Sequence, residues 1–343
     1  MKLLKCGIIG YGYMGEIRRR IIEGHPDLSL GWICDPDIDK IPSQPDIQIT
    51  TEANQVIDSD VDLVFICTPN NLIPDLTIKC LDLKKHVFCE KPPGRTVNDV
   101  RRMQEAEKRN PSGKLMFGFN HRYHPGIMKA KAISDSGRLG KILTLRGLYG
   151  KSGGKSFPDS WRNDVSISGG GILLDQGIHM LDLFNFFLGG FTSVKSFISN
   201  AHWGFDVEDN AVVILKTGDD QLAMLHSSAT FWKHMFQLTV ILEEGYLTVE
   251  GLLSKTGSYG RETLTIGRRQ FEDEAEAIGN PSEEVVYFDR DLSWDLEVEK
   301  FVEAIRNNTS IVESTSADAL SVMELVSNCY KESGFSTYVT EPY

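Results

Sequence analysis

The chain has 343 residues, and its 36 lysines and arginines against 48 aspartates and glutamates give a formal net charge of −12. With 41% hydrophobic and 24% charged residues, the composition is that of a globular protein with a core, which excludes a disordered chain, a collagen-like fibre and a disulfide mini-protein. The acidic excess argues against a general nucleic-acid-binding protein, because phosphate binding needs an excess of cations. A local basic pocket for a small anion is still compatible with it. The length favours two domains.

No segment has the pattern of an export signal or a membrane span. The first apolar run is soon interrupted by Gly7 and Gly10, which is too early for the core of a signal peptide. The longest apolar segment contains Asp175, His179 and Asp182, so it does not fit a bilayer helix. The six cysteines form no CxxC pair and are expected to be free thiols. We therefore expect a cytoplasmic protein.

The first 120 residues alternate short apolar runs with amphipathic segments. Strands are predicted over residues 3–10, 28–34, 47–50, 61–67, 87–90 and 115–120. Helices are predicted over residues 13–23, 52–58, 72–83 and 97–109. Strands that are apolar along their whole length and alternate with helices are typical of a doubly wound parallel sheet covered on both faces. We predict an α/β nucleotide-binding domain over residues 1–122.

The pattern changes after residue 125. A helix over 125–136, with Pro125 in its first turn, is followed by predicted strands at 142–149, 194–199, 211–217, 221–228, 236–242 and 246–251. Several of these alternate apolar and polar residues, as a half-buried antiparallel sheet does. Residues 267–282 are polar and predicted to be a turn region, and helices over 293–307 and 317–333 end the pattern. We predict a second, α+β domain over residues 123–343, with final helices able to pack back on the first domain.

A glycine-rich segment, Gly10-Tyr11-Gly12-Tyr13-Met14-Gly15, follows the first strand and opens the first helix. In this context G-x-G-x-x-G is typical of dinucleotide binding, where the glycines allow a tight turn, close approach of a pyrophosphate and close helix packing. Asp35 ends the second strand, about 20 residues further on, where a carboxylate binds ribose hydroxyls and repels a 2′-phosphate. The pattern favours NAD over NADP. Asp35 as a turn residue before Pro36, and FAD as the cofactor, are the alternatives.

Two further segments carry reactive side chains. Lys91 follows the strand at 87–90 and stands before two prolines, and ligands of a doubly wound sheet bind at the carboxyl ends of its strands. We therefore expect Lys91 near the nicotinamide. Asp175 and His179 are four residues apart, so a regular helix would place them on one face as an acid–base pair. A core histidine held by a carboxylate is the other interpretation of that pair.

Four segments occur in an order and at distances that resemble one enzyme family: Gly10–Gly15, Cys67-Thr68-Pro69-Asn70, Glu90-Lys91-Pro92 and Asp175-x-Gly177-x-His179. The family is Gfo/Idh/MocA, named after glucose–fructose oxidoreductase, inositol dehydrogenase and a rhizopine-catabolism protein. The resemblance covers nearly the whole chain. It implies a Rossmann domain followed by a domain with a large open sheet that is often used for dimer or tetramer contacts. It also implies NAD(P)-dependent oxidation or reduction of a sugar or cyclitol hydroxyl.

The resemblance also implies residue roles. Lys91 would contact the reacting hydroxyl, His179 would be the general base and Asp175 its acidic partner. Cofactor contacts are implied for a larger set: Gly10, Tyr11, Gly12, Tyr13, Met14, Gly15, Asp35, Thr68, Pro69, Asn71, Glu90, Lys91 and Asn120. The chain departs from the common family form at Asn71 and Ile73, where many members have histidines, and at Lys84, where many have glycine.

The predicted substrate side combines cationic and aromatic residues. The set expected to bind substrate is Lys91, Asn120, Arg122, Tyr123, Trp161, Arg162, Asp175 and His179. Such groups suit a sugar with a phosphate, diphosphate or carboxylate. The sequences of the motifs around Lys91 and Asn120 are also similar to those of family members that act in surface-polysaccharide synthesis. We therefore predict hydride transfer between NAD and a secondary hydroxyl of a phosphorylated or nucleotide-linked sugar. The alternatives are a catabolic inositol or free-sugar dehydrogenase and a non-catalytic NAD(P)-sensing regulator.

Other features add three expectations. Residues 151–155 are predicted to form a basic loop, either over an anionic group of the substrate or simply solvated. The spacing of His121 and His124 would suit a metal pair, but no nearby ligands complete it, so no metal is predicted. The predicted partners are a small sugar and other copies of the chain, as a homodimer or homotetramer through the C-terminal sheet, with no nucleic acid and no membrane.

Overall fold

The computed structural model describes residues 2–155, 157–254, 256–273 and 276–335. The chain divides into two compact units. Unit 1 contains the residues up to Phe119 together with Ser166–Gly169 and Trp294–Met323. Unit 2 contains Asn120–Val165, Gly170–Ser293 and the residues from Glu324. The chain therefore passes between the units several times, whereas the sequence analysis placed one boundary after residue 122.

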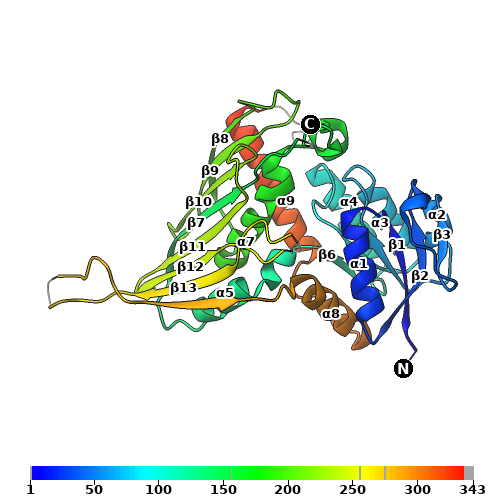
Figure 1. The fold of residues 1–343 in the computed structure, drawn as a ribbon, viewed down its shortest axis with the longest axis horizontal. Coiled ribbons are helices and arrows are strands. Elements are labelled where there is room, and N and C mark those ends of the chain that lie inside the picture. Colours follow the sequence, from blue (N-terminus) through cyan, green and yellow to red (C-terminus); the bar gives the residue numbers. More distant parts are fainter. Residues whose placement is uncertain (1, 156, 255, 274–275, 336–343) are drawn as a thin grey trace. The chain divides into compact units, whose positions relative to one another are not determined.

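Unit 1 is built on a parallel sheet with the strand order β3-β2-β1-β4-β5-β6 (Figure 1). The strands are β1 (Leu4–Ile9), β2 (Leu28–Cys34), β3 (Gln48–Thr50), β4 (Leu63–Ile66), β5 (His86–Cys89) and β6 (Leu115–Phe117). The helices are α1 (Tyr13–Gly24), α2 (Ala53–Ile57), α3 (Ile73–Asp82), α4 (Val97–Arg109) and α8 (Ser293–Arg306), with a short 3-10 turn η1 (Ile38–Lys40). The predicted doubly wound sheet is confirmed. The direction in which successive strands are added reverses between β1 and β4, and such sheets bind ligands at this switch point.

The central strands of unit 1 are apolar on both sides because helices cover both faces of the sheet. Every residue of the central strand β4 is buried, and so is every residue of the edge strand β6. The helix after β5 begins with a capping box, in which Thr96 and Asp99 satisfy each other's backbone N–H groups. This fixes where the chain leaves the segment that contains Lys91.

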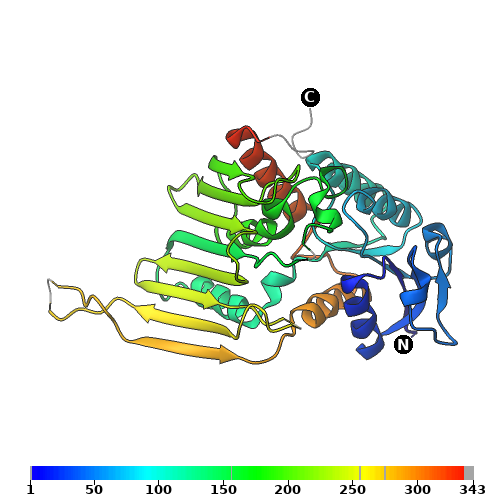
Figure 2. The same cartoon turned by 45° about the horizontal axis from the view of Figure 1, so that its top comes forward.

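Unit 2 is built on a larger sheet with the order β14-β13-β12-β11-β7-β10-β9-β8 (Figure 2). Its strands are β7 (Ile142–Gly150), β8 (Ser193–Ser199), β9 (Asn210–Lys216), β10 (Leu222–Ser228), β11 (Met235–Leu242), β12 (Gly245–Glu250), β13 (Glu262–Arg268) and β14 (Glu283–Phe288). All pairs are antiparallel except β10 with β7. The predicted mostly antiparallel sheet is confirmed.

Helices lie on one face of this sheet. On this face lie η2 (Asn120–Tyr123), α5 (Pro125–Asp135), η4 (Leu173–Gly177), α7 (Ile178–Leu188) and the last part of α9 (Ser316–Ser333). Unit 2 also contains η3 (Trp161–Asn163), and the short helix α6 (Val165–Ser168) straddles the unit boundary. The strands alternate between buried and exposed residues, so the opposite face of the sheet stays uncovered within the unit. None of the described helices is both long and apolar enough to cross a membrane.

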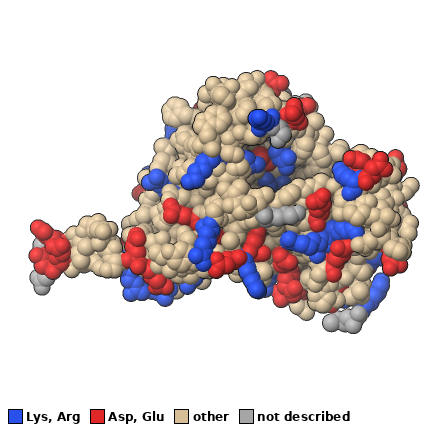
Figure 3. All heavy atoms as spheres, in the orientation of Figure 1, with Lys and Arg blue, Asp and Glu red and all other residues tan. Residues whose placement is uncertain are grey.

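Two local predictions were wrong. Strands β13 and β14 were not predicted, because β13 is interrupted by Gly267 and β14 is an edge strand with mainly exposed residues. The loop between them carries the bridge between Phe271 and Ala277 and projects beyond the sheet (Figure 1). Acidic side chains gather at its far end (Figure 3).

The second error concerns the helix before His179. A regular α-helix was expected from Asp175 onward, but residues 173–177 form the π-helical turn η4 before α7 starts at Ile178. The argument that Asp175 and His179 share a face at 3.6 residues per turn therefore does not hold as it was made. Single π turns occur often at functional sites.

Candidate active site

The glycine-rich turn of unit 1 shows a distinct reason for each glycine. Gly10 has φ +94°, and a Cβ there would lie 2.6 Å from the carbonyl oxygen of Cys67. A Cβ on Gly15 would lie 2.3 Å from the carbonyl oxygen of Gly10. Gly12 is exposed, and a Cβ there would meet nothing within 4 Å. The first and third glycines are therefore required by the fold itself, whereas the second leaves open backbone at the start of α1, as a pyrophosphate needs.

Asp35 is tied to the same turn. Its carboxylate accepts the backbone N–H of Tyr11 at 2.6 Å and that of Asp37 at 3.0 Å, and it pairs with the Nζ of Lys40 at 2.7 Å. Burial alone would raise the pKa of Asp35, but these partners hold its pKa below the ordinary value. An ionised Asp35 at the end of β2 fits a role at a ribose. Beside it, Tyr13 is half exposed and Met14 partly buried.

The segment after β4 lies beside the glycine-rich turn, because β4 pairs with β1. Thr68, Pro69 and Asn71 are all partly exposed there. Asn70 is buried, and its side chain donates to the backbone carbonyl of Ser168 at 2.7 Å. The three predicted contact residues are thus partly exposed, and Asn70, which lies among them, anchors the segment.

Glu90 and Lys91 follow β5 as neighbours in the chain, but they differ in burial. Lys91 is partly exposed, and its peptide bond to Pro92 is cis. Glu90 is buried, and its carboxylate accepts from the Nε of Arg18 at 2.7 Å. Arg18 also donates to Glu297 on α8 at 2.6 Å and stacks over the ring of Phe88. We name this the Arg18 cluster, consisting of Arg18, Glu90, Glu297 and Phe88.

The Arg18 cluster is a fully buried ionic group. The side chain of Arg18 is 0% exposed. Burial alone would lower the pKa of Arg18, but the carboxylates of Glu297 and Glu90 raise it, so the guanidinium stays charged. Arg18 and Glu297 were missed in the sequence analysis. A signal was present, since Arg18 shares the buried face of α1 with Gly15 and Ile22.

In unit 2, Asp175 and His179 stand on either side of the junction of η4 and α7. His179 is 3% exposed, whereas Asp175 is partly exposed. Asp175 interacts with Arg162 at 3.3 Å and with Lys151 at 3.6 Å, and it accepts from Gln176 at 2.7 Å. Lys151, from the predicted basic loop, thus reaches the predicted catalytic carboxylate.

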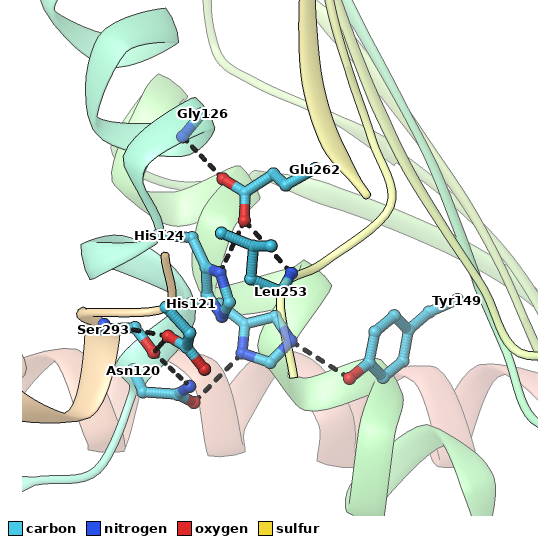
Figure 4. Close-up of polar contacts among 9 residues, drawn as sticks. Asn120, His121, His124, Gly126, Tyr149, Leu253, Glu262 and Ser293 are labelled. Carbon is cyan, nitrogen blue, oxygen red and sulfur yellow. Dashed lines mark hydrogen bonds and ion pairs between the residues drawn. The ribbon is translucent and has the colours of Figure 1, made fainter. Parts of the chain in front are cut away.

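A layer of rings surrounds His179. The imidazole of His121 stacks on that of His179 with a centroid distance of 3.7 Å and an interplanar angle of 18°. His121 hydrogen-bonds to Asn120 through Nδ1 at 3.1 Å and to the hydroxyl of Tyr149 through Nε2 at 3.0 Å (Figure 4). His124 instead pairs with the buried Glu262 at 2.8 Å. Among the described residues, no group of three or more His, Cys, Asp or Glu could hold a metal.

Several predicted substrate ligands already have partners within unit 2. Arg122 is buried and forms two hydrogen bonds with Asp182, at 2.8 and 2.6 Å. Tyr123 is 3% exposed, and the amide of Asn120 is bonded to His121 and Ser293. Arg162 is exposed and lies over the ring of Trp161. Within this group, Trp161, Arg162 and Asp175 are therefore the residues with exposed surface.

Comparison with known proteins agrees with this geometry. Residues 4–119 match the family model described as the NAD-binding Rossmann fold of an oxidoreductase family, and residues 127–248 match the GFO/IDH/MocA C-terminal domain. The chain belongs to the Gfo/Idh/MocA family. Its first unit accordingly contains an NAD-binding Rossmann domain.

Relatives with names and solved structures add to this. Levoglucosan dehydrogenase of Pseudarthrobacter phenanthrenivorans is 30% identical over 215 residues, covering 58% of this chain and 55% of that protein. Myo-inositol 2-dehydrogenase of Thermotoga maritima is 29% identical over 237 residues, covering 66% and 68%. This chain thus spans between about half and two thirds of the length of these relatives.

Solved structures share the fold over nearly the full length. A levoglucosan dehydrogenase in complex with NADH and L-sorbose is 22% identical, with a TM-score of 0.83 and 97% of each chain covered. The WlbA dehydrogenase from Bordetella pertussis, in complex with NADH and UDP-GlcNAcA, is 18% identical, with a TM-score of 0.80 and 97% of each chain covered. At these identities the likeness establishes the fold.

Proposed function

We propose that this protein is an NAD-dependent oxidoreductase acting on a secondary hydroxyl of a sugar or cyclitol. The observation that carries the proposal is the pairing, within one chain, of a dinucleotide turn left open at Gly12 with a buried, ring-stacked histidine at position 179. A regulator that only senses NAD would not need Lys91 and His179 together. The named relatives, which are dehydrogenases, support an enzyme.

We assign the roles as follows. Gly10, Gly12, Gly15 and Asp35 hold NAD, which accepts the hydride when bound. The ammonium of Lys91 stabilises the alkoxide that develops on the substrate oxygen. A ring nitrogen of His179 takes the hydroxyl proton, a contribution of roughly 10²–10⁴-fold in rate. Asp175 orients the substrate and sets the charge around His179.

An uncharged sugar or cyclitol is the substrate class that the named relatives favour. Arg122 is paired with Asp182, and both Arg162 and Lys151 interact with Asp175. Asp182 compensates Arg122, whereas Arg162 and Lys151 share the single carboxylate of Asp175, so these three cations and two carboxylates leave one net positive charge. The relatives named for levoglucosan and inositol therefore carry the choice of an uncharged substrate. A nucleotide-linked sugar is the second candidate, supported by the WlbA complex.

The test is a hydride-transfer assay that monitors NADH formation across free sugars, inositols, sugar phosphates and nucleotide sugars. Turnover with one uncharged class, lost in Lys91→Ala and in His179→Ala, is the expected result. Lys155→Ala is the matched control, because Lys155 is an exposed lysine of the basic loop. Full turnover by His179→Ala would remove the assignment of the base. Turnover with nucleotide sugars alone would replace the first substrate class with the second.

The preference for NAD over NADP is part of the proposal and has its own test. Asp35 is held ionised, and a carboxylate repels a 2′-phosphate. In Asp35→Ser, Lys40 loses its partner and becomes available to an anion. The ratio of kcat/KM for NADP to that for NAD should therefore rise at least tenfold. An unchanged ratio would show that Asp35 does not face the ribose.

We also propose that the chain associates with a second copy through the uncovered face of the unit 2 sheet. Exposed apolar side chains on neighbouring strands gather there, including Phe197 at 83% exposure and the paired residues Ile214 and Met224. Patches of this kind mark association surfaces. Light scattering after size exclusion should give a multiple of 38.4 kDa. Phe197→Asp combined with Met224→Asp should give the monomer, and a monomeric wild-type protein would overturn the idea.

A further inference from the structure

His121 is the residue in unit 2 that the proposed function leaves unexplained. Its ring is 6% exposed and lies face to face with the ring of His179. Phe236 and Tyr149 approach its edges, with centroid distances of 5.7 and 5.6 Å. A histidine so enclosed has some role beyond filling space, because leucine or phenylalanine would fill the core without needing polar partners.

The hydrogen bonds around His121 determine where its proton sits. Ser293 donates its hydroxyl proton to Asp291 at 2.7 Å, so its oxygen accepts from the amide nitrogen of Asn120 at 3.2 Å. The amide oxygen of Asn120 therefore faces the Nδ1 of His121, and a carbonyl oxygen can only accept. Nδ1 consequently carries a hydrogen.

The other nitrogen then completes the arrangement (Figure 4). In the neutral ring Nε2 accepts, and the hydroxyl of Tyr149 is the group that donates to it at 3.0 Å. Burial and contact with the hydroxyl of Tyr259 raise the pKa of Tyr149, so this hydroxyl keeps its proton. His121 is thus held at both edges, which fixes the plane of its ring.

The ring plane of His179 is restricted by the rings that pack against it, those of His121 and Tyr149. The second side-chain torsion of histidine is broad, so the rotamer does not set the direction of the ring nitrogens. A general base must be aligned with the proton that it takes, and a misplacement of about 1 Å can cost roughly 10²-fold in rate. The flat face of His121 restricts this torsion.

We propose that His121 is a positioning residue, a rigid plate fixed by Asn120 and Tyr149 that sets the ring plane of His179. The inference rests on the proposed function of His179 as the base. It assigns His121 no contact with the reacting atoms and no proton transfer. The stacked face is the part that acts, and the two hydrogen bonds serve to hold it.

Two substitutions separate the face from the hydrogen bonds. His121→Phe keeps an aromatic plate but loses both bonds. His121→Gln keeps groups able to bond to Asn120 and Tyr149 but removes the plate. Tyr149→Phe is a milder third variant that releases one edge of His121. His202→Gln is the matched control, because His202 is an exposed histidine in a loop of the same unit.

The expected kinetic result is a split between kcat and KM. With the substrate found for the wild-type enzyme, His121→Gln should lower kcat by roughly 10²-fold with little change in KM. His121→Phe should recover most of the loss, Tyr149→Phe should be intermediate, and His202→Gln should match wild type. Equal losses in the Phe and Gln variants, or no loss in either, would overturn the proposal.

Crystal structures of the two His121 variants provide a readout that does not depend on turnover. The ring of His179 should be turned in His121→Gln and unchanged in His121→Phe. If the ring of His179 kept its orientation in both variants, the positioning role of His121 would be overturned, even if no substrate were found for the wild-type protein. Loss of turnover in His179→Ala together with full turnover in His121→Gln would leave the base assignment intact and remove only the positioning role.

Discussion

The two units each bury a polar cluster next to a proposed catalytic residue, and they do so by opposite means. In unit 1 the Arg18 cluster places one cation between two carboxylates beside Lys91, with Arg18 and Glu297 fully buried. In unit 2 neutral hydrogen bonds and ring stacking hold His121 against His179. Buried ions are strongly destabilising when one partner is lost. Losing one partner of a neutral hydrogen-bond network costs less stability, but it easily disturbs the geometry of the network. We therefore expect changes in unit 1 to act on stability and changes around His121 to act on rate.

Removing Arg18 should have the largest effect on stability. Arg18→Met leaves the carboxylates of Glu90 and Glu297 buried near each other without their cation. Breaking a buried pair in this way costs about 3–5 kcal/mol. Urea unfolding monitored by circular dichroism measures the loss. Arg20→Met, an exposed position of the same helix, is the control and should unfold as wild type does. A loss below about 1 kcal/mol would show that the cluster does not depend on the charge.

Gly10→Ala should cause the second largest loss of stability. Its φ of +94° and the short approach to the carbonyl of Cys67 leave no room for a methyl group. Backbone strain of this kind costs of order 1–3 kcal/mol. Thermal melting should therefore show a clear decrease, whereas Gly24→Ala, where nothing lies within 4 Å, should melt at the wild-type temperature. Equal melting of the two variants would contradict the glycine argument.

Gly12→Ala separates binding from folding in unit 1. The position is open, so a methyl group should leave the melting temperature of the protein without cofactor unchanged. If NAD lies against this backbone, the same methyl group should weaken its binding at least tenfold, which corresponds to about 1.4 kcal/mol. Titration calorimetry with NAD provides the measurement. Wild-type affinity in Gly12→Ala would place the dinucleotide elsewhere.

The sequence predicts the features that depend on local pattern and misses those that depend on packing. Gly10, Gly12 and Gly15 are recognisable because a backbone turn needs them at fixed spacing. Arg18 is one of three consecutive arginines, a residue type that is mostly exposed, and only the approach of α8 brings Glu297 to it.

The same limit applies in unit 2. His121 was considered as half of a metal pair but not as a partner of His179, since nothing local shows that residue 179 will lie against it. The π turn at 173–177 was missed because a sequence pattern does not distinguish i+4 from i+5 bonding. Arg122 shows the opposite error. Its charge suggested a ligand for an anionic substrate, but in the folded chain its partner is Asp182.

The smallest effects, a pair of opposite pH dependences, sharpen the comparison of the units. In unit 1, Asp35 has a lowered pKa despite its burial, because Lys40 and the N–H groups of Tyr11 and Asp37 favour the carboxylate. A lowered pKa contributes stability above the unfolded value, and that contribution is lost as the pH falls through the folded value. The stability difference between wild type and Asp35→Asn should therefore be constant near neutrality and shrink below about pH 4.

The pKa of Glu208 in unit 2 is shifted in the opposite direction, upward. It accepts the hydroxyl of Tyr330 at 2.7 Å and the backbone N–H groups of Gly171 and Leu173, both at 2.8 Å, yet burial outweighs these bonds and raises its pKa. A raised carboxyl pKa favours the folded state at low pH, and this contribution is lost as the pH rises from the unfolded value through the folded one. The difference between wild type and Glu208→Gln should therefore be largest near pH 4 and decrease toward pH 7. Melting temperatures of wild type and both variants from pH 3.5 to pH 7 provide the test. If the difference from wild type changed with pH in the same way for both variants, the two carboxyl groups would not have pKa values shifted in opposite directions.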